Sequence, residues 1–316
     1  TAGTIPMFAL SALIVGASGA ISTPASSELL FRYAPPRHAP VIFAIKQTGV
    51  PMGGILAGIL VPIFILASGW RGAFVISGLM CIVAAFLLQP WRARFDEHRQ
   101  VGRTLMPTTE LLRTVGMVFN HPQTREISFA MFTFVGAQAV YAAFFVLFLV
   151  EGLGYELTVA GQVFAASQVV AVVARIFWGW LAGSFIAPRK MLALLGLGIA
   201  GSSVMTGLIT DDWGIPLVLT AACAFSATAV SWHGVLLAEV ARLAPPGQVG
   251  SLTGGVLSLG YIAMMGYPAL YGFILANGGG FTFGFLIIGV PAFIAGCLLL
   301  RRPTHSAKLT EKQNDA

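Results

Sequence analysis

Long apolar runs, separated by short polar segments, form the main pattern along this chain. The runs that contain no Asp, Glu, Lys or Arg cover residues 1–27, 47–70, 72–91, 128–150, 157–174, 191–210, 213–238 and 243–300. A helix needs about 20 apolar residues to cross the hydrocarbon core of a membrane. Membrane-spanning strands would alternate apolar and polar residues, and the continuous apolar segment 144–150 does not alternate. The pattern therefore predicts nine membrane-spanning helices, near residues 5–31, 40–67, 71–90, 126–150, 158–186, 190–209, 214–241, 249–276 and 280–300.

Composition narrows the class of protein further. Apolar residue types make up 57% of the 316 residues and charged types only 9%, whereas a soluble domain carries about 25% charged residues. So few charges exclude a soluble fold, and the high apolar content excludes a disordered chain. The three cysteines, Cys81, Cys223 and Cys297, all lie in apolar runs, which excludes a disulfide-rich scaffold. The fold class that remains is an all-α membrane protein.

The positive charges gather on one predicted side of the membrane. If nine helices alternate in direction, all but Arg71 of the 18 Lys and Arg residues flank loops on the same side. Positively charged loops mark the cytoplasmic side, so the chain is predicted to begin outside and to end in the cytoplasm. We expect it in the cytoplasmic (inner) membrane of a bacterium, as a monomer within the lipid bilayer. The net charge of +6 then requires no nucleic-acid partner.

Residues 91–125 form the only long polar stretch between the predicted helices. Thr108 or Thr109 could cap a helix there. The apolar positions on one face of this helix would be Leu111, Leu112, Val115, Val118 and Phe119. The spacing predicts an amphipathic helix that lies on the inner membrane surface, and a solvated connector is the alternative.

The segments before and after this linker resemble each other at a constant offset of 210 residues. The corner 32–36 aligns with 242–246, and Gly69 aligns with Gly279. Parallel repeats of six helices occur in one large class of secondary transporter. The repeat predicts three domains and a tail: residues 1–90 as the three-helix remnant of one bundle, 91–125 as a cytoplasmic linker, 126–302 as a six-helix bundle and 303–316 as a cytoplasmic tail. Three further helices would precede residue 1.

Four segments carry a family resemblance: 46–54 (KQTGVPMGG), the turn 69–71 (GWR), 174–182 (ARIFWGWLA) and 232–242 (WHGVLLAEVAR). With these segments the chain resembles the major facilitator superfamily, the twelve-helix solute transporters. The resemblance runs from the fourth helix of that fold to the twelfth and implies that nine of twelve transmembrane helices are present. It also implies transport by alternating access. Gly183 stands where the family's inner-turn motif usually has an acid, and Ala12 where its fourth helix usually has an Arg, which argues against a drug/proton antiporter.

Ionisable side chains inside the predicted helices are the first candidates for a solute site, because charges are costly to bury in a membrane. Lys46 and Arg175 lie two to three turns from the predicted inner ends of their helices. Either they face the translocation path or they extend to the membrane interface. If they face the path, they make it positive and favour a small organic anion as the solute. For Arg175, the family motif implies a role in gating or packing.

Polar groups in the apolar spans are the other candidates for solute binding. Each of them could equally bond a neighbouring helix. His233 could be a packing residue or a proton carrier, because imidazole titrates near neutrality. The predicted solute-binding residues are Lys46, Gln47, Gln138, Tyr141, Gln168, Trp232, His233 and Tyr261.

Two acid–base pairs at the repeated corners are predicted to act in gating or coupling, together with Arg175. Glu28 and Arg32 are spaced i,i+4, and Glu239 and Arg242 are spaced i,i+3. Both spacings place the two side chains on one helical face. We expect clamps at the cytoplasmic face that break and re-form as the bundles move.

Glycine patterns predict packing more than chemistry. The segment 196–201 matches the dinucleotide fingerprint G-x-G-x-x-G, but it lies in a charge-free span with no strand before it, so we reject that interpretation. Gly179 and Gly183, four residues apart, predict a close helix contact. No His, Cys or acidic cluster has the spacing of metal ligands, and no cofactor is expected.

The sequence therefore predicts a secondary active transporter of a small solute, with a coupling ion left open, and not an enzyme. One alternative is a sensor or assembly partner built on the same fold. Another is a membrane-embedded enzyme, which would need clustered His or acidic residues. A non-functional fragment is the third.

Overall fold

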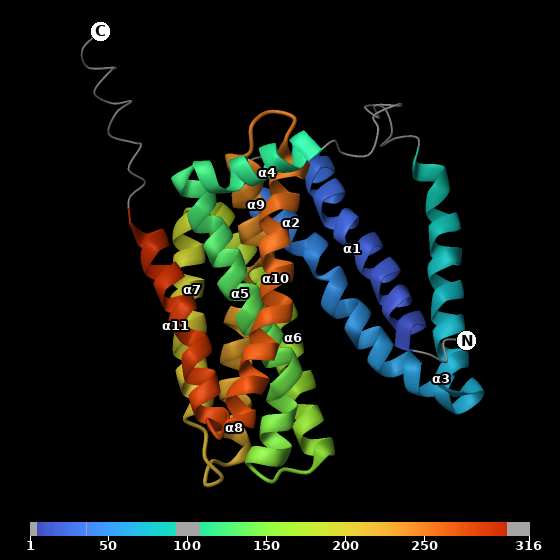
Figure 1. The fold of residues 1–316 in the computed structure, drawn as a ribbon, viewed down its shortest axis with the longest axis vertical. Helices are drawn as coiled ribbons and strands as arrows, with labels where there is room; N and C mark the ends of the chain where they lie inside the picture. Colours follow the sequence, from blue (N-terminus) through green and yellow to red (C-terminus); the bar gives the residue numbers. More distant parts are fainter. Residues whose placement is uncertain (1–4, 36, 93–107, 302–316) are drawn as a thin grey trace. The chain divides into compact units, whose positions relative to one another are not determined.

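The computed structural model describes residues 5–35, 37–92 and 108–301 (Figure 1). These ranges contain helices and short connections but no strand, which confirms the all-α prediction. The described helices are α1 (Ile5–Tyr33), α2 (Ala39–Gln47), α3 (Gly49–Arg92), α4 (Thr108–Asn120), α5 (Pro122–Leu147), the π-helix η1 (Phe148–Gly152), α6 (Leu157–Ser184), α7 (Pro188–Gly207), α8 (Ile215–Phe225), the π-helix η2 (Ser226–Val230), α9 (His233–Leu243), α10 (Val249–Ala276) and α11 (Gly280–Leu300).

Seven helical segments of the described chain are long and apolar enough to cross a membrane. The first predicted helix corresponds to α1, and the last six correspond to the segments from α5 to α11. The predicted helix 40–67 is interrupted at Thr48, where α2 gives way to α3. The predicted boundary before residue 71 lies at Gly69, whose φ of 69° and ψ of 174° break the helical path inside α3. The total of nine spans stays a prediction.

Two compact units divide the chain. Unit 1 comprises Thr1–Ser22 and Thr48–Leu111, and unit 2 comprises Thr23–Gln47 and Leu112–Ala316. In unit 1, the second limb of α3 exposes large apolar side chains, among them Phe74 and Phe86, and buries Ala73. A helix that is apolar on all sides is typical of a membrane span.

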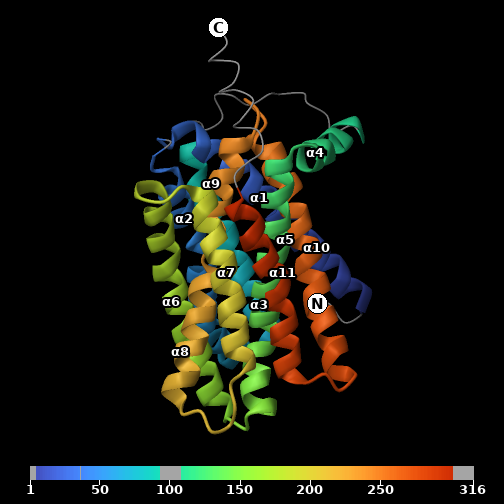
Figure 2. The same ribbon diagram turned by 90° about the vertical axis from the view of Figure 1, so that its left-hand side faces the viewer.

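Unit 2 contains a helical bundle with a continuous apolar core. In it α11 packs along α7, and α10 packs along α5 (Figures 1 and 2). Aromatic rings fill the centre of this core, where Tyr141 stacks on Phe225 at a centroid distance of 4.6 Å and contacts Phe145. These side chains are fully buried. The bundle is therefore held by large, interlocking aromatic groups.

Glycines allow α7 and α11 to approach closely. A methyl group on Gly196 would lie 3.0 Å from the Cα atom of Gly296, and one on Gly296 would lie 3.0 Å from the carbonyl oxygen of Ala193. Both distances are shorter than ordinary van der Waals contact. Close backbone contact through small residues is a common way to pack membrane helices. The first glycine of the segment 196–201 thus serves helix packing, which agrees with the rejection of a dinucleotide site.

The linker helix α4 begins at Thr108, one of the two predicted capping residues. Val118 is buried and lies against Gly255 of α10, whereas Val115 and Phe119 are about half-exposed. The side chains of Leu111 and Leu112, the linker residues 93–107 and the tail from residue 302 lie outside the described part of the chain. The surface position of α4 on the membrane stays a prediction.

Residues 23–47, which we name the 23–47 hairpin, belong to unit 2 and comprise the end of α1, a turn and α2. Helix α2 packs on α6 and α9. Ala39 and Phe43 of α2 share an apolar cluster with Leu237 and Ala241 of α9 and with Val249 of α10. The hairpin thus places the last residues of α2 beside the middle of α6.

Candidate functional site

Arg175 is the centre of the candidate site. It lies on α6, and only 2% of its surface is exposed. Its Nη1 atom donates a hydrogen bond to the backbone carbonyl of Gln47, and its Nη2 atom donates to the backbone carbonyl of Val230 at 2.6 Å. Gln47 is the last residue of α2, and Val230 is the last residue of η2. A helix end leaves carbonyl groups without an N–H partner, and Arg175 supplies the missing donors at both ends.

The charge of Arg175 has no carboxylate partner within ion-pair distance among the described residues. The carbonyl ends of two helical segments carry partial negative charge and offset part of the cost of burying the cation. The Nε atom of Arg175 is buried and has no hydrogen-bond partner in the described structure. The guanidinium therefore keeps a net positive charge and one unused donor.

His233, the first residue of α9, lies beside the guanidinium, and Trp232 precedes it as the cap of that helix. The Nδ1 atom of His233 lies 3.5 Å from Nη2 of Arg175 and 3.2 Å from the carbonyl oxygen of Val230. The His233 ring stacks on Trp232 at a centroid distance of 3.8 Å and an interplanar angle of 14°. Trp232 is fully buried and donates from Nε1 to the carbonyl of Ala229 at 2.8 Å. Stacking and hydrogen bonds thus hold the imidazole in place beside Arg175.

Lys46 and Gln47 complete the group from the end of α2. The Lys46 side chain is partly buried and directly precedes Gln47, whose backbone carbonyl accepts a hydrogen bond from Arg175. We name Lys46, Arg175 and His233 the basic cluster; they come from α2, α6 and α9. Lys46 and Arg175, two cations from two helices with no carboxylate paired to them in the described structure, can attract and hold an anion.

Helix α2 reaches the basic cluster because glycines line the faces of α6 and α9 that it touches. A methyl group on Gly179 would lie 2.7 Å from the Cβ atom of Ala44, and one on Gly183 would lie 2.7 Å from the carbonyl oxygen of Arg37. A methyl group on Gly234 would overlap the backbone of Ala44. We name Gly179, Gly183 and Gly234 the glycine seam. The predicted close contact is confirmed: Gly179 lies against α2, and Gly183 lies against the turn before it.

The other predicted solute-binding residues form no hydrogen bond with the basic cluster in the described structure. The Tyr141 hydroxyl contacts the Ser167 hydroxyl at 2.7 Å and donates to the carbonyl of Ala222 at 3.2 Å, which joins α5 to α6 and α8. Gln138 of α5 has a buried Oε1 atom that lacks a partner in the described structure. Gln168 is partly buried on α6, and Tyr261 is 43% exposed on α10. Hydrogen bonds and ring stacking thus bring together Gln47, Arg175, His233 and Trp232, with Lys46 next to Gln47 in the chain.

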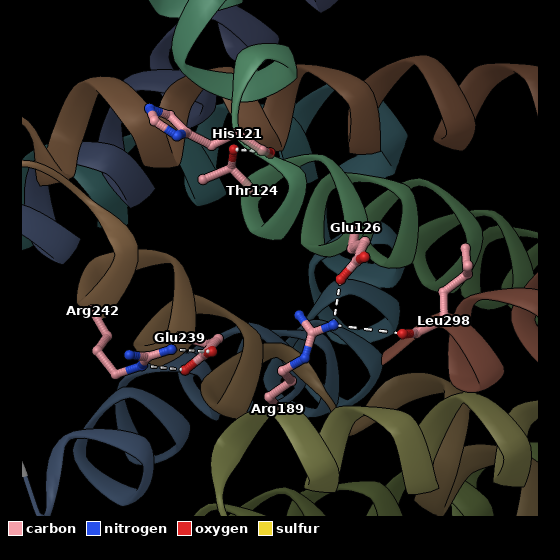
Figure 3. Close-up of polar contacts among 7 residues, drawn as sticks. All are labelled: His121, Thr124, Glu126, Arg189, Glu239, Arg242 and Leu298. Atoms are coloured by element: carbon pink, nitrogen blue, oxygen red, sulfur yellow. Dashed lines mark hydrogen bonds and ion pairs between the residues drawn. The ribbon is translucent and has the colours of Figure 1, made fainter. Parts of the chain in front are cut away.

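The two predicted acid–base pairs are both formed. Arg32 lies 3.4 Å from Glu28, and Arg242 donates to both carboxylate oxygens of Glu239 at 2.7 Å (Figure 3). The carboxylate of Glu28 also accepts a hydrogen bond of 2.8 Å from the backbone N–H of Gly250, at the start of α10. A carboxylate at a helix N-terminus is favourable. The role of these pairs in gating stays a prediction.

A third ion pair was not predicted. Arg189, at the start of α7, donates to the carboxylate of Glu126 near the start of α5, and its Nη2 atom lies 3.5 Å from the carbonyl oxygen of Leu298 in α11 (Figure 3). Nearby, the Thr124 hydroxyl contacts the carbonyl of His121, in the turn between α4 and α5. Glu126 and Arg189 are 63 residues apart, and no local pattern connects them.

The break between α2 and α3 at Thr48 could have been predicted from the sequence. Pro51 lies in the first turn of α3, where a proline is tolerated.

Among the described residues, no group of three or more His, Cys, Asp or Glu side chains could hold a metal ion.

Comparison with known proteins agrees with this architecture. The family model described as Major Facilitator Superfamily matches residues 1–266. The chain is 21% identical to a probable sulfoacetate transporter of Cupriavidus necator, an alignment that covers 91% of this chain and 70% of that protein. It is 24% identical to a hexuronate transporter of Bacillus subtilis, with 87% and 68% covered. Its fold resembles the fucose:proton symporter of E. coli with a TM-score of 0.67 at 18% identity, covering 88% of this chain and 73% of that one.

Proposed function

The chain belongs to the Major Facilitator Superfamily, and from this premise we propose that it moves a small organic anion across the membrane by alternating access. It is an integral, multi-pass membrane protein, and the named relatives are solute transporters. The gradient of an ion or of a second solute would drive transport. We propose the cytoplasmic membrane of a bacterium as its location, with the C-terminus in the cytoplasm.

The proposed solute class rests on the basic cluster, which has no acidic partner in the described structure. An unpaired buried cation is costly, so a protein that keeps one gains when an anion binds. Arg175 offers a planar set of N–H donors that suits a carboxylate or sulfonate. Lys46 adds a second positive charge from α2. Electrostatic attraction in this low-dielectric setting favours anions over neutral solutes of the same size.

The relatives support the same class of solute. Sulfoacetate and hexuronates, which the names of two relatives give as transported solutes, are both organic anions. At 21% and 24% identity, these names suggest a class and not a compound. A panel of labelled solutes is therefore needed to find which acid this chain transports.

Uptake of labelled anions tests the proposal. Proteoliposomes that contain the protein would be offered sulfoacetate, glucuronate and the neutral sugar glucose. We expect uptake of at least one anion and none of glucose. Lys46→Ala should lower anion uptake about tenfold, the effect of one lost hydrogen bond to a charged group, and Lys46→Arg should restore part of it.

Lys190→Ala is the matched control, because Lys190 is an exposed cation at the start of α7. It loses the same charge and should transport normally. Anion uptake that is equal in Lys46→Ala and Lys190→Ala, or uptake of glucose in place of the anions, would contradict the proposed solute class.

A further inference from the structure

Helix α4 lies across one end of the helical bundle of unit 2 instead of running along it (Figures 1 and 2). Its C-terminal end is tied to α5 by Thr124, whose hydroxyl lies 2.9 Å from the carbonyl oxygen of Met117 and 3.1 Å from that of Val118. A helix of 13 residues is barely stable in water by itself. The stability of α4 therefore depends on what its faces contact.

One face of α4 is docked on α10. Thr114 and Val118, which are spaced i,i+4, both lie against Gly255, where an added methyl group would lie 2.8 Å from each of the two side chains. Val118 is buried and belongs to the apolar core of the bundle. This contact fixes how α4 is turned about its own axis, and the directions of its other faces follow from it.

A second face of α4 is apolar and exposed. Successive residues of an α-helix are turned by about 100°, so Val115 and Phe119 lie about 100° round the helix from the docked pair. The exposed fraction is 53% for Val115 and 47% for Phe119. Asn120, which is also exposed, lies on the third, polar face. The helix thus separates an apolar side from a polar side, as helices on membrane surfaces do.

Two membrane spans begin where α4 lies. The segments Pro122–Gly152 and Val249–Ala276 are both long and apolar enough to cross a membrane. Helix α4 ends two residues before the first segment and contacts the second at Gly255, within about two turns of its start. An apolar helix face at this level meets lipid, because the surface of the adjoining spans is covered by lipid.

Exposed aromatic residues mark the same level on α6. Trp180 and Phe185, at the end of α6, contact each other with ring centroids 5.2 Å apart, and 47% and 72% of their surfaces are exposed. This end of α6 lies at the same end of the bundle as the start of α5, because Arg189 at the start of α7 binds Glu126. Tryptophan is enriched where the hydrocarbon core meets the headgroups, which places the membrane surface at the end where α4 lies.

An exposed cation lies just after the corner between α4 and α5. Arg125 is in the first turn of α5 and is exposed, and the neighbouring carboxylate of Glu126 is bound to Arg189. In the proposed orientation this end of the bundle faces the cytoplasm, and the cytoplasmic leaflet carries anionic lipids. A guanidinium binds a phosphate group through paired N–H donors.

We propose that α4 is a lipid-binding helix, in which Val115 and Phe119 enter the membrane leaflet at this end of the bundle while Arg125 binds the phosphate of an anionic lipid. The occupant of the exposed face is lipid, and neither water nor a second copy of the chain covers it. The inference goes beyond solute transport and does not depend on which solute is carried.

Spin labels measure what surrounds this face. In a background without the three native cysteines, Phe119→Cys or Val115→Cys carries the label on the apolar face, and Asn120→Cys carries it on the polar face as the matched control. The whole chain would be reconstituted into vesicles of phosphatidylcholine, with or without phosphatidylglycerol in both leaflets. Collisions of the label with oxygen, which concentrates in lipid, are compared with collisions with a water-soluble nickel chelate.

The labels at positions 115 and 119 should collide several times more with oxygen than with the nickel chelate, and the label at position 120 should show the reverse. Phosphatidylglycerol should raise the oxygen-to-nickel ratio at position 119 by up to about fivefold, the effect of one basic residue near an anionic surface. Arg125→Gln should abolish this increase. Lys190→Gln, which removes an exposed charge at the start of α7, should keep it.

More collisions with nickel than with oxygen at positions 115 and 119 would show that α4 is a solvated connector, and the proposal would be wrong. Few collisions with either reagent would also contradict it, because another part of the chain or a second copy would then cover the face. The lipid contact of Arg125 is wrong if phosphatidylglycerol has no effect, or the same effect in Arg125→Gln and Lys190→Gln. If Phe119→Cys does not fold, the label at position 115 decides. Uptake is not measured here, so the proposed solute class stands or fails separately.

Discussion

Two arginines of unit 2, the buried Arg175 and the partly buried Arg189, have opposite kinds of partner. Arg189 lies at the ends of α5, α7 and α11, and its charge is balanced by the carboxylate of Glu126. Arg175 lies in the middle of α6, and its partners are backbone carbonyls and an imidazole. Arg189 also has two buried donors without a partner in the described structure, Nε and Nη1, so free donors do not separate the two residues. An arginine paired with a carboxylate fastens helices to one another and offers an anion no net positive charge. An arginine held only by neutral carbonyls keeps its charge available, which is why the candidate site lies at Arg175.

Replacing each arginine in turn tests whether Arg189 serves stability and Arg175 serves anion binding. Arg189→Met leaves the carboxylate of Glu126 without its cation. The pair is partly buried, and we expect a loss of about 2 kcal/mol in the free energy of unfolding, as for a hydrogen bond to a charged group. Arg175→Met should change stability much less, because removal of an uncompensated charge offsets the two lost carbonyl bonds. Its anion uptake should fall below detection.

Thermal unfolding in detergent and uptake in proteoliposomes measure the two effects separately. Glu126→Gln combined with Arg189→Met removes both charges and should recover part of the lost stability. The comparison is wrong if Arg175→Met unfolds as readily as Arg189→Met, or if Arg189→Met abolishes uptake in protein that remains folded.

A smaller effect is expected at the glycine seam, on which the approach of α2 to Arg175 depends. Gly234→Ala places a methyl group against the backbone of Ala44, which cannot move aside as a flexible side chain would. We expect a loss of about 2 kcal/mol in the free energy of unfolding, typical of an overpacked contact.

Gly161→Ala is the control for that substitution. Gly161 lies on α6 with no neighbouring atom within 4 Å of the added methyl group, so the substitution should be neutral, or stabilising by up to about 1 kcal/mol from the higher helix propensity of alanine. Equal stability of Gly234→Ala and Gly161→Ala would show that α2 does not lie close to α9.

The smallest effect is expected at Tyr141, which was predicted to bind solute but bonds neighbouring helices in the structure. Tyr141→Phe removes the contacts to Ser167 and Ala222 and keeps the stacking on Phe225. We expect a loss of about 1 kcal/mol in stability, the usual net value of one hydrogen bond, and an unchanged KM for the transported anion. A raised KM with unchanged stability would contradict this prediction and indicate that Tyr141 binds the solute.

Much of the fold was predictable because a membrane imposes simple rules on a sequence. Spans of apolar residues and the absence of alternation both depend on residues that are close to one another in the sequence. The pairs Glu28–Arg32 and Glu239–Arg242 were predictable for the same reason, since i,i+4 and i,i+3 spacing places side chains together on one helix. The pair Glu126–Arg189 joins two different helices, and no local spacing could have predicted it.

By itself, the sequence determined that this protein is a bundle of apolar helices and that Lys46, Arg175 and His233 lie within spans where a charge is costly. Only the tertiary structure decided that these three meet, that Tyr141 and Tyr261 do not join them, and that Arg175 bonds two broken helix ends. The physical reason is distance along the chain. Hydrophobicity acts residue by residue and can be summed along a sequence, whereas the partners of a buried charge come from whichever helices pack around it.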